Sequence, residues 1–328
     1  MRMNKACLKL LAGLSIAGFA TAPGASAQAL QKVTIVIFTA PSLGAFLPPI
    51  IKAEKFDQKN GLDITFAART PDAYTAQFNS GEFQVGGSAA LLTVGLADLR
   101  GVKATYLFNL FDYWGAIVTA RPNVKSLKDL NGKTIAAASG TTNYIMSEWF
   151  ARQQGLDFKK AKVVNTAPPG LVGYALADRA AAVQLWEPAY TTVLSKKPSE
   201  RTLDLAIKSN WKKFAGSGNI PYLGLAAHIG WVKKHEKMIP ELYAAYKEAA
   251  QWIQAHPNAA AKLISPKGDA ANQKGIASLI RSNDRLGLNI GWASKLRKEI
   301  HSVYAAGKSI GYLPGDPSSA TIYSGPTK

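Results

Sequence analysis

The sequence predicts an α/β protein of two lobes, each built on a mainly parallel β-sheet flanked by helices. The first observation is a continuous apolar, β-branched run, Val33 to Phe38, which is typical of a strand buried on both faces of a parallel sheet. The second is that such runs alternate with helical segments, once before residue 112 and again after residue 133. The third is the length of 328 residues, which exceeds a usual single core and favours two domains.

The first unit follows the order strand, helix, strand, helix, strand, helix, strand. A proline-containing turn, Thr39 to Ser42, breaks the first apolar run. The carboxyl ends of parallel strands meet at one edge of a sheet, and open α/β sheets bind ligands there. The expected strands are 33–38, 63–67, 83–86 and 103–110, and the expected helices are 46–55, 74–79 and 91–99.

The second unit repeats this alternation after a break at Tyr113 to Ala120. Its first strand ends in a small polar turn where a helix starts, which aims unpaired backbone N–H groups beyond the strand ends. The expected strands are 134–138, 162–165 and 181–186, and the expected helices are 143–154, 171–177 and 188–194.

The last third of the chain contains one strand-like run, 222–228, followed by helical patterns only. The tail helices are expected at 240–255, 258–264, 273–286 and 293–306. A tail without strands cannot build its own sheet, so we expect it to return and cover the first unit. Lobe 1 is therefore assigned residues 28–115 and 222–328, and lobe 2 residues 116–221. Crossings are expected near 113–118 and 218–223, where glycines at 216 and 218 suit a hinge.

The first 27 residues have the pattern of a cleaved secretory signal peptide. Arg2, Lys5 and Lys9 are basic, residues 10–19 are apolar, and Ala25-Ser26-Ala27 is a cleavage signal of the A-x-A type. We therefore expect a soluble, monomeric protein in the periplasm. Cys7 is the only cysteine and lies in the segment removed, so the mature chain should have neither disulfide nor cysteine metal site.

The chain is strongly basic, with a formal net charge of +18, of which the three basic leader residues contribute +3. Lysine pairs such as Lys159-Lys160 and Lys212-Lys213 are scattered over distant segments, and no run of five basic residues occurs. This distribution predicts a solvated basic surface and argues against nucleic acid as a partner.

Candidate ligand contacts gather at the expected strand ends and at one helix start. Hydroxyl groups and helix N–H groups suit an anion, an indole ring offers a flat apolar surface, and an arginine can clamp an anion with two hydrogen bonds. The candidates are Thr39, Arg69, Ser88, Asp112, Ser139, Thr141, Thr142, Trp186 and Glu187.

Structural alternatives exist for several of these residues. Trp186 could be a core aromatic residue. Glu187 could complement the dipole of the helix that follows it. Asp112 could cap a turn, and Arg69 could be a surface residue. The hydroxyls from Ser139 to Thr142 could cap a helix and contact solute at the same time.

Four segments, in this order, resemble the periplasmic solute-binding proteins of ABC importers in the nitrate, sulfonate, taurine and thiamine-precursor group. They are Asn79 to Gly87 (NSGEFQVGG), Ser126 to Ala138 (SLKDLNGKTIAAA), Trp186-Glu187-Pro188, and Pro240 to Pro257, which is similar to that group's ExYxAxxEAxxWIxxxP helix. The resemblance covers essentially the whole mature chain. It implies a two-lobed type II periplasmic binding protein that closes on solute and delivers it to a permease in the inner membrane.

The resemblance also implies that the turn at 139–142 and the Trp186-Glu187 step face the ligand. Asp112 and Glu187 would repel a strong anion unless they contact an amine or are structural. Either the solute is zwitterionic or heterocyclic with N–H donors, or those acids are structural. A sulfonate, taurine or nitrate solute is expected first, because a taurine-like or sulfonate solute fits the group that the chain resembles. The alternative is a pyrimidine-type thiamine precursor, or another small aromatic solute, that stacks on Trp186 or Tyr144 and donates an amine to Glu187.

Two other functional classes compete with solute binding. An enzyme is disfavoured because the sequence has no G-x-S-x-G or H-E-x-x-H motif, and because its four histidines are not at metal-ligand spacing. Thiamine-pyrimidine synthases of similar fold are rich in cysteine, which the mature chain lacks. We expect no cofactor and no metal. An inert scaffold is disfavoured by the glycine-rich double crossing, which suits hinge closure.

Overall fold

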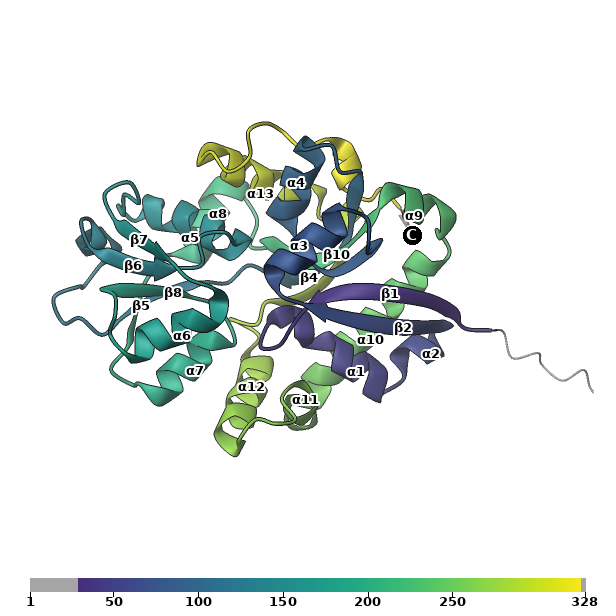
Figure 1. Cartoon of the computed structure of the whole chain (residues 1–328), viewed down its shortest axis with the longest axis horizontal. Helices are drawn as coiled ribbons and strands as arrows, with labels where there is room; N and C mark the ends of the chain where they lie inside the picture. Colours follow the sequence, from purple (N-terminus) through teal and green to yellow (C-terminus); the bar gives the residue numbers. More distant parts are fainter. Residues whose placement is uncertain (1–28, 326–328) are drawn as a thin grey trace, which may run out of the picture.

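The computed structural model describes residues 29–325, and the expected signal peptide, residues 1–27 with Cys7, lies outside this range. Two β-sheets with helices on both faces form two lobes that lie side by side (Figure 1). Within the described range, no helix is both long enough and apolar enough to cross a bilayer.

Lobe 1 contains a six-stranded mixed sheet in the order β11-β4-β10-β3-β1-β2. The first four strands of the chain run in one direction, while β10 and β11 run antiparallel to their neighbours. Its strands are β1 (Gln31–Phe38), β2 (Leu62–Arg69), β3 (Val85–Ala90), β4 (Ala104–Asp112), β10 (Pro221–His228) and β11 (Leu288–Trp292).

Lobe 2 contains a five-stranded sheet in the order β7-β6-β8-β5-β9. Only β5 runs against the others, since it pairs antiparallel with both β8 and β9. Its strands are β5 (Ala116–Thr119), β6 (Thr134–Ala137), β7 (Lys162–Asn165), β8 (Ala182–Leu185) and β9 (Arg201–Leu203).

Helices cover both faces of each sheet (Figure 1). The lobe 1 helices are α1 (Leu47–Ala53), α2 (Phe56–Lys59), α3 (Pro71–Asn79), α4 (Leu91–Leu99), α9 (Ile229–Lys234), α10 (Met238–Ala255), α11 (Pro257–Ile264), α12 (Ala270–Ser282) and α13 (Arg297–Ser309). Lobe 2 has α5 (Thr142–Gln153), α6 (Pro168–Leu176), α7 (Ala189–Lys196) and α8 (Ile207–Ala215). Short 3-10 turns are η1 (Leu43–Ala45), η2 (Leu127–Leu130), η3 (Ala293–Lys295) and η4 (Ser319–Thr321).

Glycines in β3 allow aromatic side chains to pack directly on the lobe 1 sheet. A Cβ atom at Gly86 would lie 2.2 Å from the hydroxyl oxygen of Tyr74, and one at Gly87 would lie 2.9 Å from Cγ2 of Ile35. Both distances are too short for real side chains, so the sequence Val-Gly-Gly at the start of β3 fixes how closely α3 and β1 approach it.

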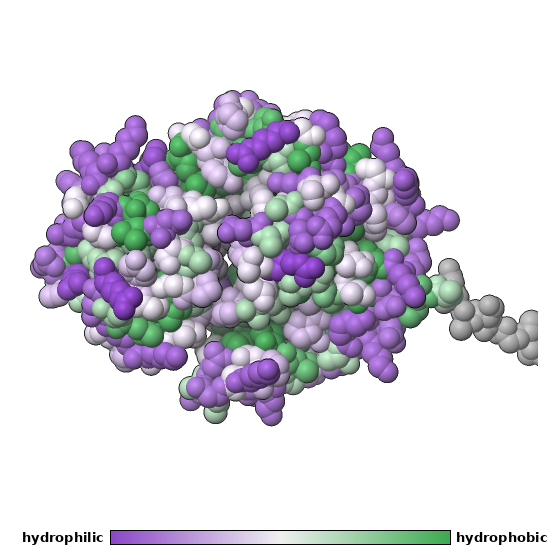
Figure 2. All heavy atoms as spheres, in the orientation of Figure 1, coloured by the Kyte–Doolittle hydropathy of each residue, from purple (hydrophilic) through white to green (hydrophobic). Residues whose placement is uncertain are grey.

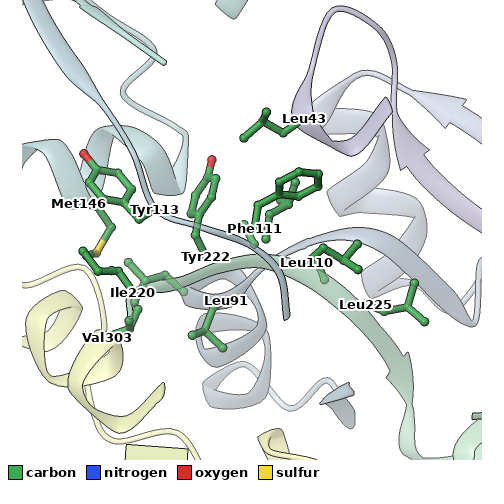
Figure 3. Packing of buried hydrophobic residues seen from close by; sticks show 14 of the residues in the cluster. Leu43, Leu91, Leu110, Phe111, Tyr113, Met146, Ile220, Tyr222, Leu225 and Val303 are labelled. Atoms are coloured by element: carbon green, nitrogen blue, oxygen red, sulfur yellow. The ribbon is translucent and has the colours of Figure 1, made fainter. Parts of the chain in front are cut away.

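The two chain crossings run next to each other between the lobes. The backbone N–H of Tyr113 donates to the carbonyl of Ile220 at 2.7 Å. The Tyr113 ring stacks on Phe150 of α5 at 5.4 Å, and its hydroxyl bonds Ser147 at 2.9 Å. Figure 3 shows Tyr113 among buried residues of both lobes, including Met146 and Val303. The hydrophobic core therefore continues from one lobe into the other through the crossings.

The expectation of a helix-only tail is wrong, because β11 pairs with β4 at the edge of the lobe 1 sheet. The helix expected over 273–286 ends at Ser282, where Asn283 takes a left-handed conformation (φ 51°) that terminates it. The elements α2, β5, β9, α8 and α9 were not predicted. β9 has only three residues and a mostly exposed pattern, so it gives no apolar run to detect.

Candidate functional site

A cavity of about 510 Å³ lies between the lobes and is called here the Trp186 pocket. Lobe 1 contributes the loop after β1 and the α11–α12 hairpin, and lobe 2 contributes the start of α6 and the turn from β8 to α7. The lining residues are Ala40, Pro41, Ser42, Ala45, Phe46, Pro168, Pro169, Leu171, Val172, Trp186, Pro188, Ala189, Thr192, Ile264, Ser265, Pro266, Lys267, Asn272 and Ile276.

The local sequence explains why strands end and helices begin at this pocket. β1 stops at Phe38, and the Ala40-Pro41-Ser42 loop turns into the pocket wall. Prolines 168 and 169 occupy the first positions of α6, where a missing N–H costs nothing. On the other side, β8 ends at Leu185, and the carbonyl of Trp186 accepts from Tyr190 N–H at 3.0 Å as α7 begins. Parallel strands thus present their carboxyl ends to the pocket from both lobes.

The Trp186 pocket is mainly apolar. Proline rings, Phe46, Leu171, Ile276 and the indole of Trp186 form most of its surface. Figure 2 shows hydrophobic surface gathered in the recess between the α11–α12 hairpin and the body of the molecule. Such a lining with few polar groups is typical of sites for small organic molecules, which usually have volumes of roughly 300 to 1,000 Å³.

Few polar groups face this apolar surface. Lys267 is the charged residue in the lining, and no carboxylate of the described residues belongs to it. The hydroxyl groups among the lining residues belong to Ser42, Thr192 and Ser265. The side-chain oxygen of Asn272 is buried without a hydrogen-bond partner in the structure. Residues 29–325 contain no cluster of three or more His, Cys, Asp or Glu side chains that could hold a metal ion.

Trp186 is the candidate residue that the structure places in the pocket lining. Its indole is half-buried rather than enclosed in the core. Thr39 is exposed one residue before the lining begins, and its N–H donates to the carbonyl of Arg69 at 2.8 Å. Glu187 follows Trp186, but its side chain points away into protein. Its carboxylate accepts from the Thr191 N–H (3.1 Å) and hydroxyl (2.9 Å), and pairs with Arg285 at 2.7 Å.

The candidates at the start of α5 lie outside the lining of the Trp186 pocket. Thr141 caps the helix: its hydroxyl oxygen accepts from Tyr144 N–H at 3.2 Å. Thr142 is buried and bonds the hydroxyl of Thr93 in α4 at 3.0 Å, which makes it a contact between the lobes. The N–H of Ser139 donates to the side chain of Asn165 at 3.0 Å. Solute contacts by these residues remain predictions.

The side chains of Arg69 and Ser88 form their hydrogen bonds with neighbours in lobe 1. The Arg69 guanidinium donates to Gln77 at 2.7 Å and lies 5.3 Å from the ring centre of Phe83. Ser88 is fully buried, and its hydroxyl accepts from the Phe38 N–H at 2.9 Å. The structure therefore gives both residues a role in holding lobe 1 strands and helices together.

Asp112 ends β4 at the first crossing. It accepts hydrogen bonds from the side chains of Asn109 (3.0 Å) and Asn289 (2.8 Å). Burial raises the pKa of this carboxyl to about 6, although the hydrogen bonds from Asn289 and Asn109 act in the opposite direction. Its own N–H donates to the Gly287 carbonyl at 2.6 Å. Asp112 therefore joins the crossing to the segment that leads into β11.

A second and more polar cavity, of about 810 Å³, lies beside the crossings. Asp112, Trp114 and Asn219 line it together with residues 202–209, 283–284 and 287–289. Its carboxylates have partners: Asp112 is bonded by two asparagines, and Asp284 pairs with Lys208 at 3.4 Å. Two strands, β4 and β9, end at this cavity beside the crossings, whereas β1 and β8 end at the Trp186 pocket.

Several lining residues were not predicted from the sequence. The sequence marked the turn at Pro41 and Ser42 only as the end of a strand. The candidate ligand contacts were chosen at strand ends, so these two residues could have been included. Pro168 and Pro169 follow the strand at 162–165 and carried the same signal. Ile264, Lys267 and Ile276 lie on a helical hairpin that has no strand end, so no local pattern marks them as pocket residues.

Solved structures with similar folds include periplasmic binding proteins. The aliphatic sulphonate binding protein SsuA from Escherichia coli is 16% identical, with a TM-score of 0.69 over 88% of this chain and 95% of that one. The alkanesulfonate-binding protein SsuA from Xanthomonas axonopodis pv. citri, bound to MOPS, is 14% identical, with a TM-score of 0.71 over 90% and 99%. The nitrate-binding protein NrtA from Synechocystis PCC 6803 is 15% identical, with a TM-score of 0.63 over 89% and 84%.

The fold is thus that of the two-lobed periplasmic binding proteins, with two mixed sheets flanked by helices. A family model described as NMT1/THI5 like matches residues 52–260, more than half of the chain. The chain belongs to this NMT1/THI5-like family. A search of curated proteins found no match.

Proposed function

We propose that this protein is the solute-binding component of an ABC importer, which captures a small organic solute in the Trp186 pocket and delivers it to a permease. One observation carries the proposal: strand ends of both lobes converge on one apolar cavity that contains Trp186. The similarity of fold to sulfonate- and nitrate-binding proteins supports a transport role. In this proposal the protein binds without catalysis, as a monomer in the periplasm after loss of residues 1–27.

Within the sulfonate, taurine and nitrate class, the pocket favours an organosulfonate with an apolar body. A cavity of about 510 Å³ is far larger than nitrate or taurine requires, and most of its surface is apolar. Lys267 supplies a positive charge at its edge for the anionic group. The repulsion expected from acidic residues is removed, because Glu187 is neutralised by Arg285 and Asp112 lies at the hinge.

A pyrimidine-type thiamine precursor has less support from the same geometry. Stacking on Trp186 is available to an aromatic ring. However, the amine of such a solute was expected to meet Glu187, whose two carboxylate oxygens are already bonded by Thr191 and Arg285. This solute would have to displace an existing ion pair. We keep it as the second candidate, ahead of an enzyme of the synthase type within this family.

A thermal-shift screen tests the proposed solute class. The panel contains nitrate, taurine, hexanesulfonate, naphthalenesulfonate and an aminopyrimidine. A ligand at 100 times its dissociation constant stabilises the folded protein by about 2.7 kcal/mol, which gives a readily measured rise in melting temperature. We expect the apolar sulfonates to give the largest rise. A larger rise with the aminopyrimidine, or with nitrate alone, would contradict the assignment.

A further inference from the structure

An ion pair with a buried carboxylate and a half-exposed guanidinium joins the lobes beside the Trp186 pocket. Glu187 belongs to the turn between β8 and α7 of lobe 2, and Arg285 belongs to the segment between α12 and β11 of lobe 1. The Arg285 Nε lies 2.7 Å from the Glu187 carboxylate. The Glu187 side chain is 0% exposed, whereas that of Arg285 is 37% exposed.

The surroundings hold both partners in place. Thr191, in the first turn of α7, donates to Glu187 through its N–H and its hydroxyl, so lobe 2 alone fixes the carboxylate. The Arg285 guanidinium lies 5.4 Å from the ring centre of Tyr190, close enough for a cation–π contact. Tyr190 is fixed in turn by an edge contact with Trp114 at 4.8 Å and by a hydrogen bond to Thr202 at 2.8 Å.

The ion pair also lies between the pocket and the hinge. On the lobe 2 side, Glu187 is the residue between Trp186 and Pro188, which both line the pocket. On the lobe 1 side, Arg285 lies two residues before Gly287, whose carbonyl accepts from Asp112 N–H at the first crossing. A rotation that opens the Trp186 pocket would therefore draw Glu187 of lobe 2 away from Arg285 of lobe 1.

Burying two charges is costly, and an ion pair offsets that cost only when other hydrogen bonds hold its members. Glu187 is bonded by Thr191 of its own lobe, so much of its water is displaced whether or not the lobes meet. Arg285 keeps part of its exposed surface. When the lobes close, the attraction between the two charges therefore exceeds the remaining cost of removing them from water. A second ion pair between the lobes among the described residues, Lys208 with Asp284, is 83% and 73% exposed and contributes little.

We propose that Glu187 and Arg285 form a latch that exists only in the closed arrangement of the lobes. This inference rests on the proposed solute-binding function and deepens it. Arg285 is then a positioning residue: it sets the balance between open and closed forms without touching solute. A solute shifts this balance only by the difference between its affinities for the two forms. The latch therefore affects the apparent affinity for solute, because it changes the free energy needed to close the lobes.

Distances between two spin labels test the latch without any solute. The labels are placed on the full chain at Glu54→Cys in lobe 1 and Lys159→Cys in lobe 2, both exposed, with Cys7→Ser removing the one natural thiol. With Glu187 and Arg285 intact, the labelled protein should give a measurable population at the short distance of the closed arrangement. In Arg285→Gln, the ratio of closed to open molecules should fall at least tenfold, and Arg285→Lys should restore part of it.

Two further variants complete the experiment. Glu187→Gln with Arg285→Gln leaves no unpaired buried charge, so it should fold even if a single variant does not, and it should also populate the long distance. Lys208→Gln, which removes the exposed pair, should leave the distances unchanged. Unaltered distances in the double variant, or an equal change in Lys208→Gln, would overturn the proposal. A failed solute screen would contradict the proposed function but leave these distances as expected.

Discussion

Replacing Asp112 with asparagine should remove a pH-dependent loss of stability at the hinge. The carboxyl is held by Asn109 and Asn289, and burial raises its pKa from 3.8 to about 6. A carboxyl with a higher pKa in the folded state binds its proton more tightly there. Its contribution therefore favours folding at low pH and is lost as the pH rises from about 4 to about 6.

The magnitude follows from the same two pKa values. The interval between 3.8 and about 6, at about 1.36 kcal/mol per pH unit, corresponds to about 3 kcal/mol. Asparagine cannot ionise. The free energy of unfolding of Asp112→Asn, minus that of the natural protein, should therefore rise by about 3 kcal/mol between roughly pH 3.5 and pH 7.5. The new amide also faces the side-chain amides of Asn109 and Asn289, which adds an offset that does not change with pH.

Urea unfolding followed by tryptophan fluorescence at a series of pH values measures this difference, and a carboxyl NMR titration reads the pKa directly. Asp129→Asn is the matched control. The backbone N–H groups of Lys125 and Ser126 hold the pKa of Asp129 below its usual value, so its contribution is present at neutral pH and lost as the pH falls. The two variants should show opposite slopes. Parallel curves for Asp112→Asn and the natural protein would refute the reasoning.

Three further substitutions test the pocket and the fold. Trp186→Ala should weaken binding of the best solute at least tenfold by calorimetry because it removes the indole wall, while Trp231→Ala in α9 should not; equal losses would count against the pocket. Gly86→Ala should lower the free energy of unfolding measured in urea by roughly 1 to 3 kcal/mol, because the new Cβ would clash with the Tyr74 hydroxyl. Unchanged stability would contradict this clash and show that α3 can move away. Thr141→Ala should cost about 1 kcal/mol through the lost α5 cap, and a neutral result would contradict that role.

Most of the fold could be predicted because the signals for its elements are local. The buried run at β1 and the helix at Leu91–Leu99 follow directly from hydrophobic pattern and length. β11 could not be predicted in the same way, because a five-residue strand at a sheet edge needs a partner that lies about 180 residues earlier in the chain. Asn283 before it was a readable stop signal for the preceding helix.

The site was harder to predict than the fold. Trp186 could be placed at the pocket because it follows a buried strand in a lobe of parallel strands. The partner of Glu187 could not be found, because Arg285 comes 98 residues later, in a loop that follows a helix. Local sequence patterns show where strands end. The hydrogen-bond partner of a polar side chain, in contrast, depends on contacts between segments that are distant in the chain.

The position of β10 in the middle of the lobe 1 sheet dictates the order in which the chain can fold. β10 lies between β3 and β4, so both strands lack their shared neighbour until residues 221–228 have been synthesised. All five strands of the lobe 2 sheet, in contrast, come from the continuous stretch 116–203. The lobe 2 sheet can therefore be complete while β3 still lacks one neighbour and β4 lacks both of its neighbours, β10 and β11. Lobe 1 should therefore be the slower partner in refolding and the main source of misassembled chains.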